Sequence, residues 1–392
     1  MPGKYIVAHN RDRDFYQLAA AVAEADLLEC LVTDYYVGAQ RFSVPRLKHR
    51  RSPLISADKT RSIPSTVALQ ALRGPLDRIG IDTIHNVNRR IGRKVRDVAR
   101  RSPNADLLLY SSYAREAFVD PDLEDRKKHL FVFHPHPTLI GEILAPDVSH
   151  WRIGQSGLKE ETGLTHRVDV LNDELSHADK VLCASALTKR SVVRAGFDAD
   201  RVHVVPYGIA RPMPAYQEVR TKADPLRFLF VGQAIHRKGV HHLLAAWQRH
   251  RPANAELVMV CSRSQDGLLE NLPDGVRVKS GLSNEELWKE YCRAHCFVLP
   301  SLVEGFGLVL LEAMSAGCYT IFSENTGFAD LGLPENTGLQ CKAGDTTSLG
   351  EAIERAAGMF ADGKIHHDEI RQTSELFSGA SFRERVRECL GM

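Results

Sequence analysis

Two glutamates, Glu304 and Glu312, are separated by seven residues in the stretch EGFGLVLLEAMSAG. Four apolar residues before it, 296–299, predict a short strand that is buried on both faces. The glycines of the turn at 304–307 leave backbone N–H groups open to close approach, and we expect a helix to begin at Leu308. The unpaired N–H groups and the dipole of such a helix start favour an anion, most naturally a phosphate.

The two carboxylates are suited to hydroxyl groups rather than to the phosphate itself. An ionised carboxylate accepts hydrogen bonds from hydroxyls and would repel a bare phosphate. Glu312 lies about five residues into the expected helix, roughly 7 Å further on at 1.5 Å per residue. We therefore expect Glu304 and Glu312 to hold hydroxyl groups on opposite sides of one diphosphate. That is the layout of a nucleotide sugar, with sugar hydroxyls at one end and ribose hydroxyls at the other.

The composition of the whole chain is that of a soluble globular protein. The chain has 392 residues, of which 43% are hydrophobic and 26% are charged, and this length predicts two or three domains. No segment approaches the ~18–20 apolar residues that cross a bilayer, and the N-terminus lacks the apolar core of a signal peptide. The eight cysteines are scattered without the pair spacing of zinc sites. These features predict a cytoplasmic protein, and we expect no metal in the site.

Strands and helices alternate along the chain. In the first half, we expect strands at 5–8, 30–33, 107–110, 131–133, 181–184 and 202–205. In the second half, we expect them at 227–231, 257–260, 276–278, 296–299 and 319–322. This alternation predicts parallel, doubly wound sheets, which bind ligands beyond the carboxyl ends of their strands.

The string EGFGLVLLEAMSAG, together with the strand before it, resembles the E-x7-E signature of the retaining glycosyltransferases of family 4, which have the GT-B fold. The resemblance implies an α/β protein with two Rossmann-like, doubly wound domains that face a cleft. The first, at 1–209, would bind the acceptor, and the second, at 210–375, would bind the nucleotide sugar. A terminal helix at 376–392 would cross back onto the first domain. A linker with three prolines is expected at 210–225.

The run GQAIHRKG at 232–239 resembles the phosphate loop of this family, in which a Lys before Gly contacts the donor diphosphate. Lys238 matches that position. Many relatives also carry an Arg after the first glycine, where this chain has Gln233, and Arg237 is expected to supply that charge. Donor contacts are therefore expected from Arg237, Gly232, Gly305, Phe306, Gly307 and Glu312.

Two histidines follow the expected strand at 131–133, in the run HPHP. In similar enzymes a residue at the end of this strand, often His, points into the cleft near the donor sugar. His134 directly follows the strand and is the first candidate for this role, and His136 is the alternative.

The resemblance implies a retaining, metal-independent transfer of a glycosyl group from a nucleoside diphosphate sugar, a co-substrate, to an acceptor hydroxyl. No other cofactor is expected. The transition state would resemble an oxocarbenium ion. Glu304 would orient sugar hydroxyls, Lys238 would neutralise the leaving phosphate, and His134 would complete the catalytic set. Two alternatives remain open: a nucleotide-sugar 2-epimerase of the same fold, and a non-catalytic sugar-binding relative.

The segment 41–101 is strongly basic, with sixteen Lys or Arg residues against four Asp. Apolar residues at helical spacing accompany the charges at 81–98, and a basic amphipathic helix suits an anionic membrane surface or a phosphate-bearing acceptor. The expected acceptor is therefore a glycan or a lipid-linked molecule, with peripheral contact at the inner face of a membrane. Nucleic acid is not expected, because no aromatic residues interleave the charges.

Overall fold

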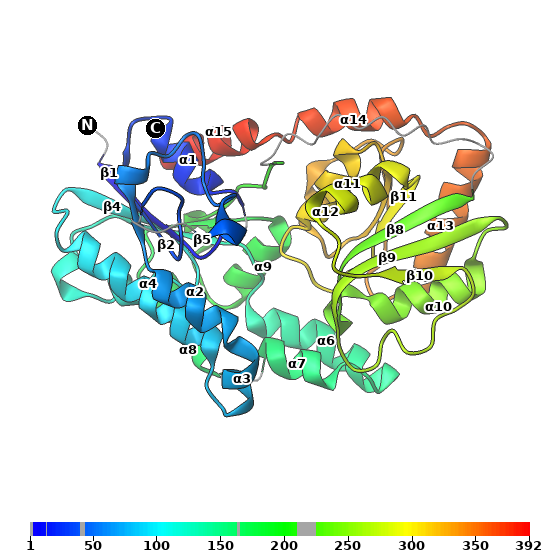
Figure 1. Cartoon of the computed structure of the whole chain (residues 1–392), viewed down its shortest axis with the longest axis horizontal. Coiled ribbons are helices and arrows are strands. Elements are labelled where there is room, and N and C mark those ends of the chain that lie inside the picture. Colours follow the sequence, from blue (N-terminus) through cyan, green and yellow to red (C-terminus); the bar gives the residue numbers. More distant parts are fainter. Residues whose placement is uncertain (1–2, 13, 40–43, 163–164, 210–224) are drawn as a thin grey trace.

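The computed structural model describes residues 3–12, 14–39, 44–162, 165–209 and 225–392. Two parallel sheets, each with its own helices, form two lobes that lie side by side (Figure 1). We call the sheet β1–β7 with its helices the first lobe, and the sheet β8–β13 with its helices the second lobe. The predicted fold, two Rossmann-like α/β domains, is confirmed. The expected linker lies almost entirely outside the described residues.

The sheet of the first lobe has the strand order β3-β2-β1-β4-β5-β6-β7. Its strands are β1 (Lys4–His9), β2 (Leu28–Thr33), β3 (Thr60–Ser62), β4 (Ala105–Tyr110), β5 (Lys128–Val132), β6 (Lys180–Cys183) and β7 (Val202–Val204). Its helices are α1 (Gln17–Ala23), α2 (Pro64–Ala71), α3 (Arg73–Arg78), α4 (Thr83–Ala99), α5 (Arg115–Phe118), α6 (Pro137–Trp151), α7 (Gln155–Thr162), α8 (Thr165–Ser176) and α9 (Ala186–Arg194).

The sheet of the second lobe has the order β10-β9-β8-β11-β12-β13, the doubly wound order of dinucleotide-binding folds. Its strands are β8 (Leu226–Ala234), β9 (Ala255–Ser264), β10 (Val276–Lys279), β11 (Cys296–Leu299), β12 (Tyr319–Ser323) and β13 (Gly338–Cys341). Its helical segments are the 3-10 turns η5 (His236–Lys238) and η6 (Gly327–Leu331) and the helices α10 (Val240–His250), α11 (Asn284–Arg293), α12 (Leu308–Ser315), α13 (Thr346–Ala361) and α14 (His367–Glu375).

Strand β8 is longer than the sequence predicted. The expected turn at Gly232 is wrong, because Gly232 lies inside β8 opposite Cys261. Pairing continues as far as Ala234, opposite Ser264, and the register shifts between Gly232 and Ala234. The irregularity at this glycine lets the strand keep its partner for two more residues. The loop that we expect to bind phosphate, called the phosphate loop below, therefore begins after Ala234.

Helix α4 explains the amphipathic pattern of the basic segment. Its apolar face is in the core of the first lobe, where Val87, Ile91 and Val95 are at most 1% exposed. Arg89 and Arg93 lie on the exposed face of the same helix. This apolar face is therefore buried in the core of the first lobe and is not free to enter a bilayer. No described helix combines the length and apolar character that a membrane crossing requires.

The chain ends by crossing between the lobes. Helix α14 packs against α12 of the second lobe, and α15 (Gly379–Leu390) packs against α1 of the first (Figure 1). Phe382 is fully buried, with its ring 5.9 Å from that of Phe131 and 5.2 Å from that of Tyr207. Backbone hydrogen bonds join Ile209 to Phe377 and to Gly379. The expected return of the last helix to the first domain is confirmed.

Candidate active site between the two lobes

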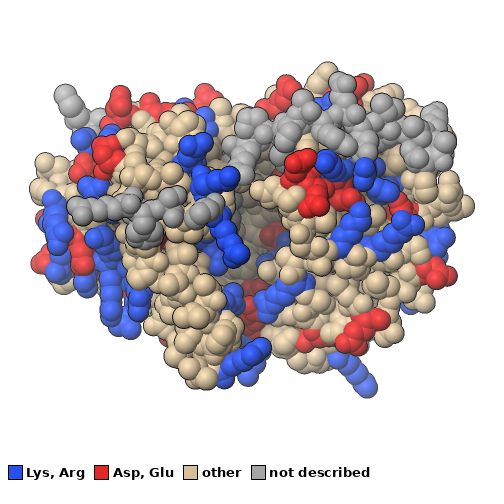
Figure 2. All heavy atoms as spheres, viewed as in Figure 1, with Lys and Arg blue, Asp and Glu red and all other residues tan. Residues whose placement is uncertain are grey.

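The two loops that carry the candidate residues follow neighbouring strands of the second sheet. The turn η5 follows β8, and the loop 300–307 follows β11, which pairs with β8. The strand order reverses between β8 and β11, and such switch points are where open parallel sheets bind ligands. The space-filling view shows a hollow between the lobes at the centre of this face (Figure 2). The topology thus brings Lys238 and Glu304 to one edge of the sheet.

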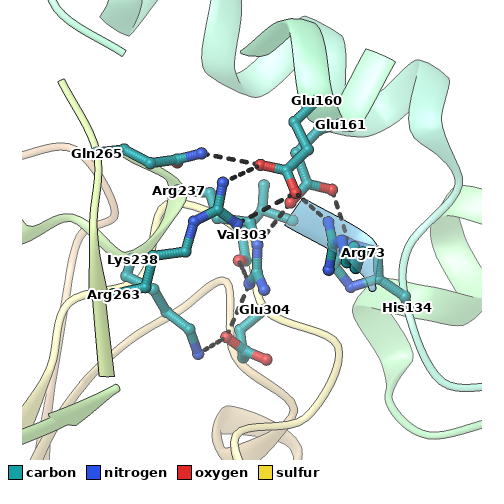
Figure 3. A network of polar contacts seen from close by, with 10 residues as sticks. All are labelled: Arg73, His134, Glu160, Glu161, Arg237, Lys238, Arg263, Gln265, Val303 and Glu304. Atoms are coloured by element: carbon teal, nitrogen blue, oxygen red, sulfur yellow. Dashed lines mark hydrogen bonds and ion pairs between the residues drawn. The ribbon is translucent and has the colours of Figure 1, made fainter. Parts of the chain in front are cut away.

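Glu304 is the acceptor for two cations of the phosphate loop. Its Oε2 accepts hydrogen bonds from Arg237 Nη1 at 3.1 Å and from Lys238 Nζ (Figure 3). The three side chains are only 13–17% exposed. Burial raises the pKa of Glu304, but the charges of Lys238 and Arg237 outweigh burial and lower it to about 2. Glu304 is therefore a carboxylate, held by its two partners.

Arg237 also reaches across to the first lobe. Its Nε donates to Oε1 of Glu161, in α7, at 2.8 Å, and Oε2 of Glu161 lies 3.2 Å from His134 Nε2. Burial raises the pKa of Glu161, but His134 and Arg237 lower it to about 2. Figure 3 shows Glu161 between these two residues, with His134 on the side of the first lobe. One carboxylate thus links the candidate residues of both lobes.

Sequence reasoning missed Glu161. It belongs to the helical run QSGLKEET, which has no motif that marks one of its acids. Its partner Arg237 is 76 residues away in the sequence, so the contact exists only because the lobes meet. The one available signal was the acidic pair of Glu160 and Glu161, and that signal does not mark a contact with the other lobe.

The preceding residue, Glu160, extends the network away from Glu304. Its carboxylate accepts hydrogen bonds from Arg263 Nη2 at 3.0 Å and from Gln265 Nε2 at 2.8 Å (Figure 3). Arg73, in α3, lies 3.7 Å from the same carboxylate. These contacts connect the end of β9 in the second lobe to α3 and α7 of the first lobe.

The structure separates the roles of the two histidines. His134 is 30% exposed at its side chain and faces Glu161. His136 is 2% exposed, accepts a hydrogen bond from Thr138 N as the cap of α6, and lies 3.1 Å from Asn172 Oδ1. His134 is therefore the residue that reaches the cleft, and His136 shapes the loop that presents it.

Glu312 lies in the middle of α12, as expected. Its Oε2 accepts a hydrogen bond from Tyr291 Oη at 2.9 Å. Burial raises the pKa of Glu312, although the hydrogen bond from Tyr291 lowers it. Helix α12 begins after Gly307, whose φ of 92° favours glycine, and no side chain among the described residues caps it. The first N–H groups of α12 are thus available to an anion.

Gly305 has a function that the sequence did not reveal. A β-carbon at Gly305 would lie 1.9 Å from the carbonyl oxygen of Phe133, at the end of β5. Because Gly305 has no side chain, the two lobes can approach each other closely at this position. Phe306 is 3% exposed, and its ring lies 5.8 Å from that of Tyr207 in the first lobe. That the backbone N–H groups of Gly305 and Phe306 contact a donor stays a prediction.

Two cavities, each of about 200 Å³, share Glu161 in their walls. One lies on the side of the first lobe and is lined by residues that include His85, Arg89, Ser112, Glu116 and His134. The other lies towards the phosphate loop, and its lining residues include Gln233, Arg237, Arg263 and Gln265. The Glu161 bridge therefore stands between an opening of the first lobe and an opening of the second.

The second half of the chain matches a known family of enzymes. Residues 215–359 match the family model of the glycosyl transferases group 1. A glycogen synthase of Mycobacterium tuberculosis is 30% identical over 191 residues, which are 47% of this chain and 42% of the relative. The chain spans about half the length, or less, of the curated relatives that it matches.

Solved structures share the whole fold. A sucrose-phosphate synthase from Thermosynechococcus elongatus has a TM-score of 0.67 at 18% identity, covering 100% of this chain and 98% of that one. Anabaena Alr3699/HepE, in complex with UDP and glucose, has a TM-score of 0.60 at 14% identity and full coverage of both chains. The chain thus has the GT-B fold, and its residues 215–359, which hold the phosphate loop and both glutamates, carry the pattern of the glycosyl transferases group 1.

Proposed function

We propose that this protein is a retaining glycosyltransferase that moves a sugar from a nucleoside diphosphate sugar to an acceptor hydroxyl. The observation that carries the proposal is the cluster of Lys238, Arg237 and Glu304 at the switch point of a GT-B fold, facing His134 across the cleft. The match of residues 215–359 to the glycosyl transferases group 1 supports it.

The donor would lie along the start of α12. Its diphosphate takes the first N–H groups of the helix together with the charges of Lys238 and Arg237. Both cations now have Glu304 as their anionic partner. A bound diphosphate would share these cations and leave Glu304 free to accept hydrogen bonds from sugar hydroxyls. Glu312 would accept those of the ribose, held in place by Tyr291.

The transfer needs charge stabilisation more than a strong base. Negative charge builds on the β-phosphate as the bond to the anomeric carbon breaks, and Lys238, Arg237 and the N–H groups near Gly307 stabilise it. The sugar becomes oxocarbenium-like, as in glycoside hydrolysis. The leaving phosphate accepts the proton of the attacking hydroxyl, which then bonds to the same face of the sugar. The nucleotide sugar is a co-substrate, and the proposal includes no further cofactor.

The acceptor would enter from the cavity of the first lobe beside His134. His85, Arg89 and Ser112 line this cavity and offer donors to hydroxyl or phosphate oxygens, so a glycan or a lipid-linked acceptor suits it.

We propose that the protein works at the cytoplasmic face of an anionic membrane. Leu72 and Ile79 flank α3, which contacts the basic helix α4, and they are 55% and 72% exposed. Co-sedimentation with anionic but not neutral vesicles is the expected result.

The first experiment is a thermal-shift screen against UDP-, GDP- and ADP-sugars. A ligand at 100 times its Kd stabilises the folded chain by about 2.7 kcal/mol. The donor found in this way is then incubated with candidate acceptors, and the anomeric configuration of the product is read by NMR. Retention of the donor configuration is the expected result. If no nucleotide sugar raises the melting temperature and none is consumed, the proposal is wrong.

The same assay separates the alternatives. A nucleotide-sugar 2-epimerase would convert the donor without an acceptor, whereas the proposed transferase releases nucleoside diphosphate only when an acceptor is added. A non-catalytic relative would bind a nucleotide or sugar without turnover. The paired Lys238 and Glu304 favour the transferase, since a bare binding protein has no need of charge at the leaving phosphate.

A further inference from the structure

Four ligand-type side chains converge at the interface of the lobes, outside the candidate active site. Asp147 comes from α6 of the first lobe, His236 from η5, and His241 and His242 from the first turn of α10. His236 Nε2 and His241 Nε2 lie 2.7 and 2.8 Å from Asp147 Oδ1. His242 Nε2 lies 2.7 Å from Asp147 Oδ2. Three imidazoles thus point one nitrogen each at a single carboxylate.

Hydrogen bonding alone leaves one of these imidazoles unsatisfied. His236 is 0% exposed, and among the described residues neither of its ring nitrogens has a hydrogen-bond partner. Its Nε2 lies 2.7 Å from Asp147 Oδ1, within ion-pair distance, but the approach does not have hydrogen-bond geometry. A buried polar atom without a partner costs about 1–3 kcal/mol and calls for a bound group.

The rings of His236 and His241 lie face to face. They stack with centroids 4.5 Å apart and an angle of 8° between their planes. Asp147 supplies a carboxylate oxygen beside them, and the ligand atoms of Asp147, His236 and His241 all lie within 4.8 Å of one another.

We propose that Asp147, His236, His241 and His242 hold one divalent transition-metal ion, with Zn²⁺ as the best match. Three imidazole nitrogens and one carboxylate oxygen form a four-ligand set that suits Zn²⁺, and Co²⁺ can replace it as a probe. Asp147, His236 and His241 form the centre of this set, and His242 Nε2 approaches the other carboxylate oxygen of Asp147, Oδ2. The side chain of Asp147 is 13% exposed and leaves a path from solvent.

The surroundings orient the ring of His242, whereas Nδ1 of His236 and Nδ1 of His241 have no hydrogen-bond partner among the described residues. His242 Nδ1 lies 2.8 Å from Thr346 Oγ1, and this contact orients the ring so that Nε2 faces Asp147. The Trp151 ring packs edge-on against His241 and His242, at 5.2 and 5.1 Å between centroids. Metal-binding histidines commonly have such an outer contact on their second nitrogen, which sets the tautomer and the ring orientation.

A metal at this place would clamp the two lobes. Asp147 belongs to the first lobe and the histidines to the second, and His236 directly precedes Arg237 and Lys238. The ion would fix the phosphate loop at the closed interface without touching the donor. The proposal is independent of the proposed reaction. It places a metal outside the candidate active site, for which the sequence predicted no metal.

The test uses the full chain without an affinity tag, treated with a chelator and then titrated with Zn²⁺ or Co²⁺. One ion per chain is expected by calorimetry and elemental analysis, and Co²⁺ should give visible absorption bands of a tetrahedral site. Asp147→Asn and His241→Gln should each weaken binding roughly 100-fold or more, since each removes one of four ligands. His250→Gln is the matched control, because His250 lies on the same helix α10 and pairs with Glu354 instead.

Two results overturn the proposal. The first is wild-type binding no tighter than that of the double variant Asp147→Asn/His241→Gln. The second is equal loss of binding in His250→Gln. Should Asp147→Asn fail to fold, His242→Gln replaces it, and the Co²⁺ spectrum of the wild-type chain still decides whether nitrogen and oxygen ligands surround the ion.

Discussion

Glu161 in the first lobe accepts a hydrogen bond at 2.8 Å from Nε of Arg237 in the phosphate loop of the second. The same carboxylate lies 3.2 Å from His134 Nε2, and Arg237 in turn donates to Glu304. The position of the Arg237 side chain therefore depends on contact between the lobes. In the proposed function, a donor site that includes this contact between the lobes would keep water away from the activated sugar.

Glu161→Gln tests this dependence. The substitution keeps the size of the side chain and removes its charge, so Arg237 loses one of its two carboxylate partners. A hydrogen bond to a charged group contributes about 1.5–3 kcal/mol, and we expect kcat/KM for the donor to fall roughly 10–100-fold. Steady-state kinetics with varied donor measures it. Glu160→Gln, which affects Arg263 and Gln265 instead, is the control, and an equal loss there would contradict the specific role of Glu161.

Lys238→Ala and Glu304→Ala should each reduce kcat by at least ~10²-fold, the scale for one lost electrostatic contact in the transition state. Lys238→Ala removes a charge from the leaving phosphate, and Glu304→Ala removes the acceptor for sugar hydroxyls. Turnover is measured at saturating donor and acceptor. Lys364→Ala is the control, since Lys364 is 65% exposed and pairs with nearby Asp362. Wild-type turnover in either site variant would show that these residues do not serve the reaction.

The parts of the site that lie within one short stretch could be predicted from the sequence. The strand before Glu304, the turn at 304–307 and the helix that carries Glu312 form one local unit, and the residue types of each part dictate it. The choice of Lys238 came instead from the resemblance of the run at 232–239 to the phosphate loop of the family. The alternation of elements was enough for the fold class, although the edge strands β3 and β13 were not predicted, because their residues, TRS and GLQC, do not form an apolar run.

The sequence could not predict the contacts between the two lobes. Glu161, Asp147 and the approach of Gly305 to Phe133 all join residues that are far apart in the chain. The apolar stripe of α4 shows a second limit, because a helix face that packs on its own sheet has the same periodicity as one that enters a membrane. Only the fold shows that Val87 and Ile91 are already buried.

Tyr291→Phe tests the role of Glu312 at the ribose. The phenol donates to Glu312 at 2.9 Å, and its loss leaves a buried carboxylate with one partner fewer, which raises the pKa of Glu312 further. A Glu312 that takes up a proton accepts hydrogen bonds less well. We expect the Kd for nucleoside diphosphate to rise several-fold, and roughly 10–100-fold in Glu312→Ala, where the acceptor is gone. Calorimetry measures both, and unchanged affinity in Glu312→Ala would place the ribose elsewhere.

The charge network also predicts how stability depends on pH. The pKa of Glu161 is lowered from 4.5 to about 2, so this carboxylate favours the folded chain. Its contribution is complete above pH 4.5 and disappears as the pH falls towards 2. The melting temperature of the wild type should therefore exceed that of Glu161→Gln at pH 6, and the difference should shrink below pH 4.5. A difference that stays constant with pH would mean that the charge of Glu161 is not what stabilises the interface.

Gly305→Ala addresses the contact between the lobes without removing any charge. The new methyl group would lie 1.9 Å from the Phe133 carbonyl oxygen, which belongs to backbone and cannot rotate away, so the lobes have to separate locally. We expect a loss of roughly 1–3 kcal/mol in stability, together with lower turnover, because Glu304 and His134 adjoin this contact. Gly358→Ala is the control, since nothing lies within 4 Å of its added methyl group in α13, and an alanine there should be neutral or stabilise by up to about 1 kcal/mol. Equal stability of both variants would show that the interface yields easily at Gly305, and that closure of the lobes does not depend on this glycine.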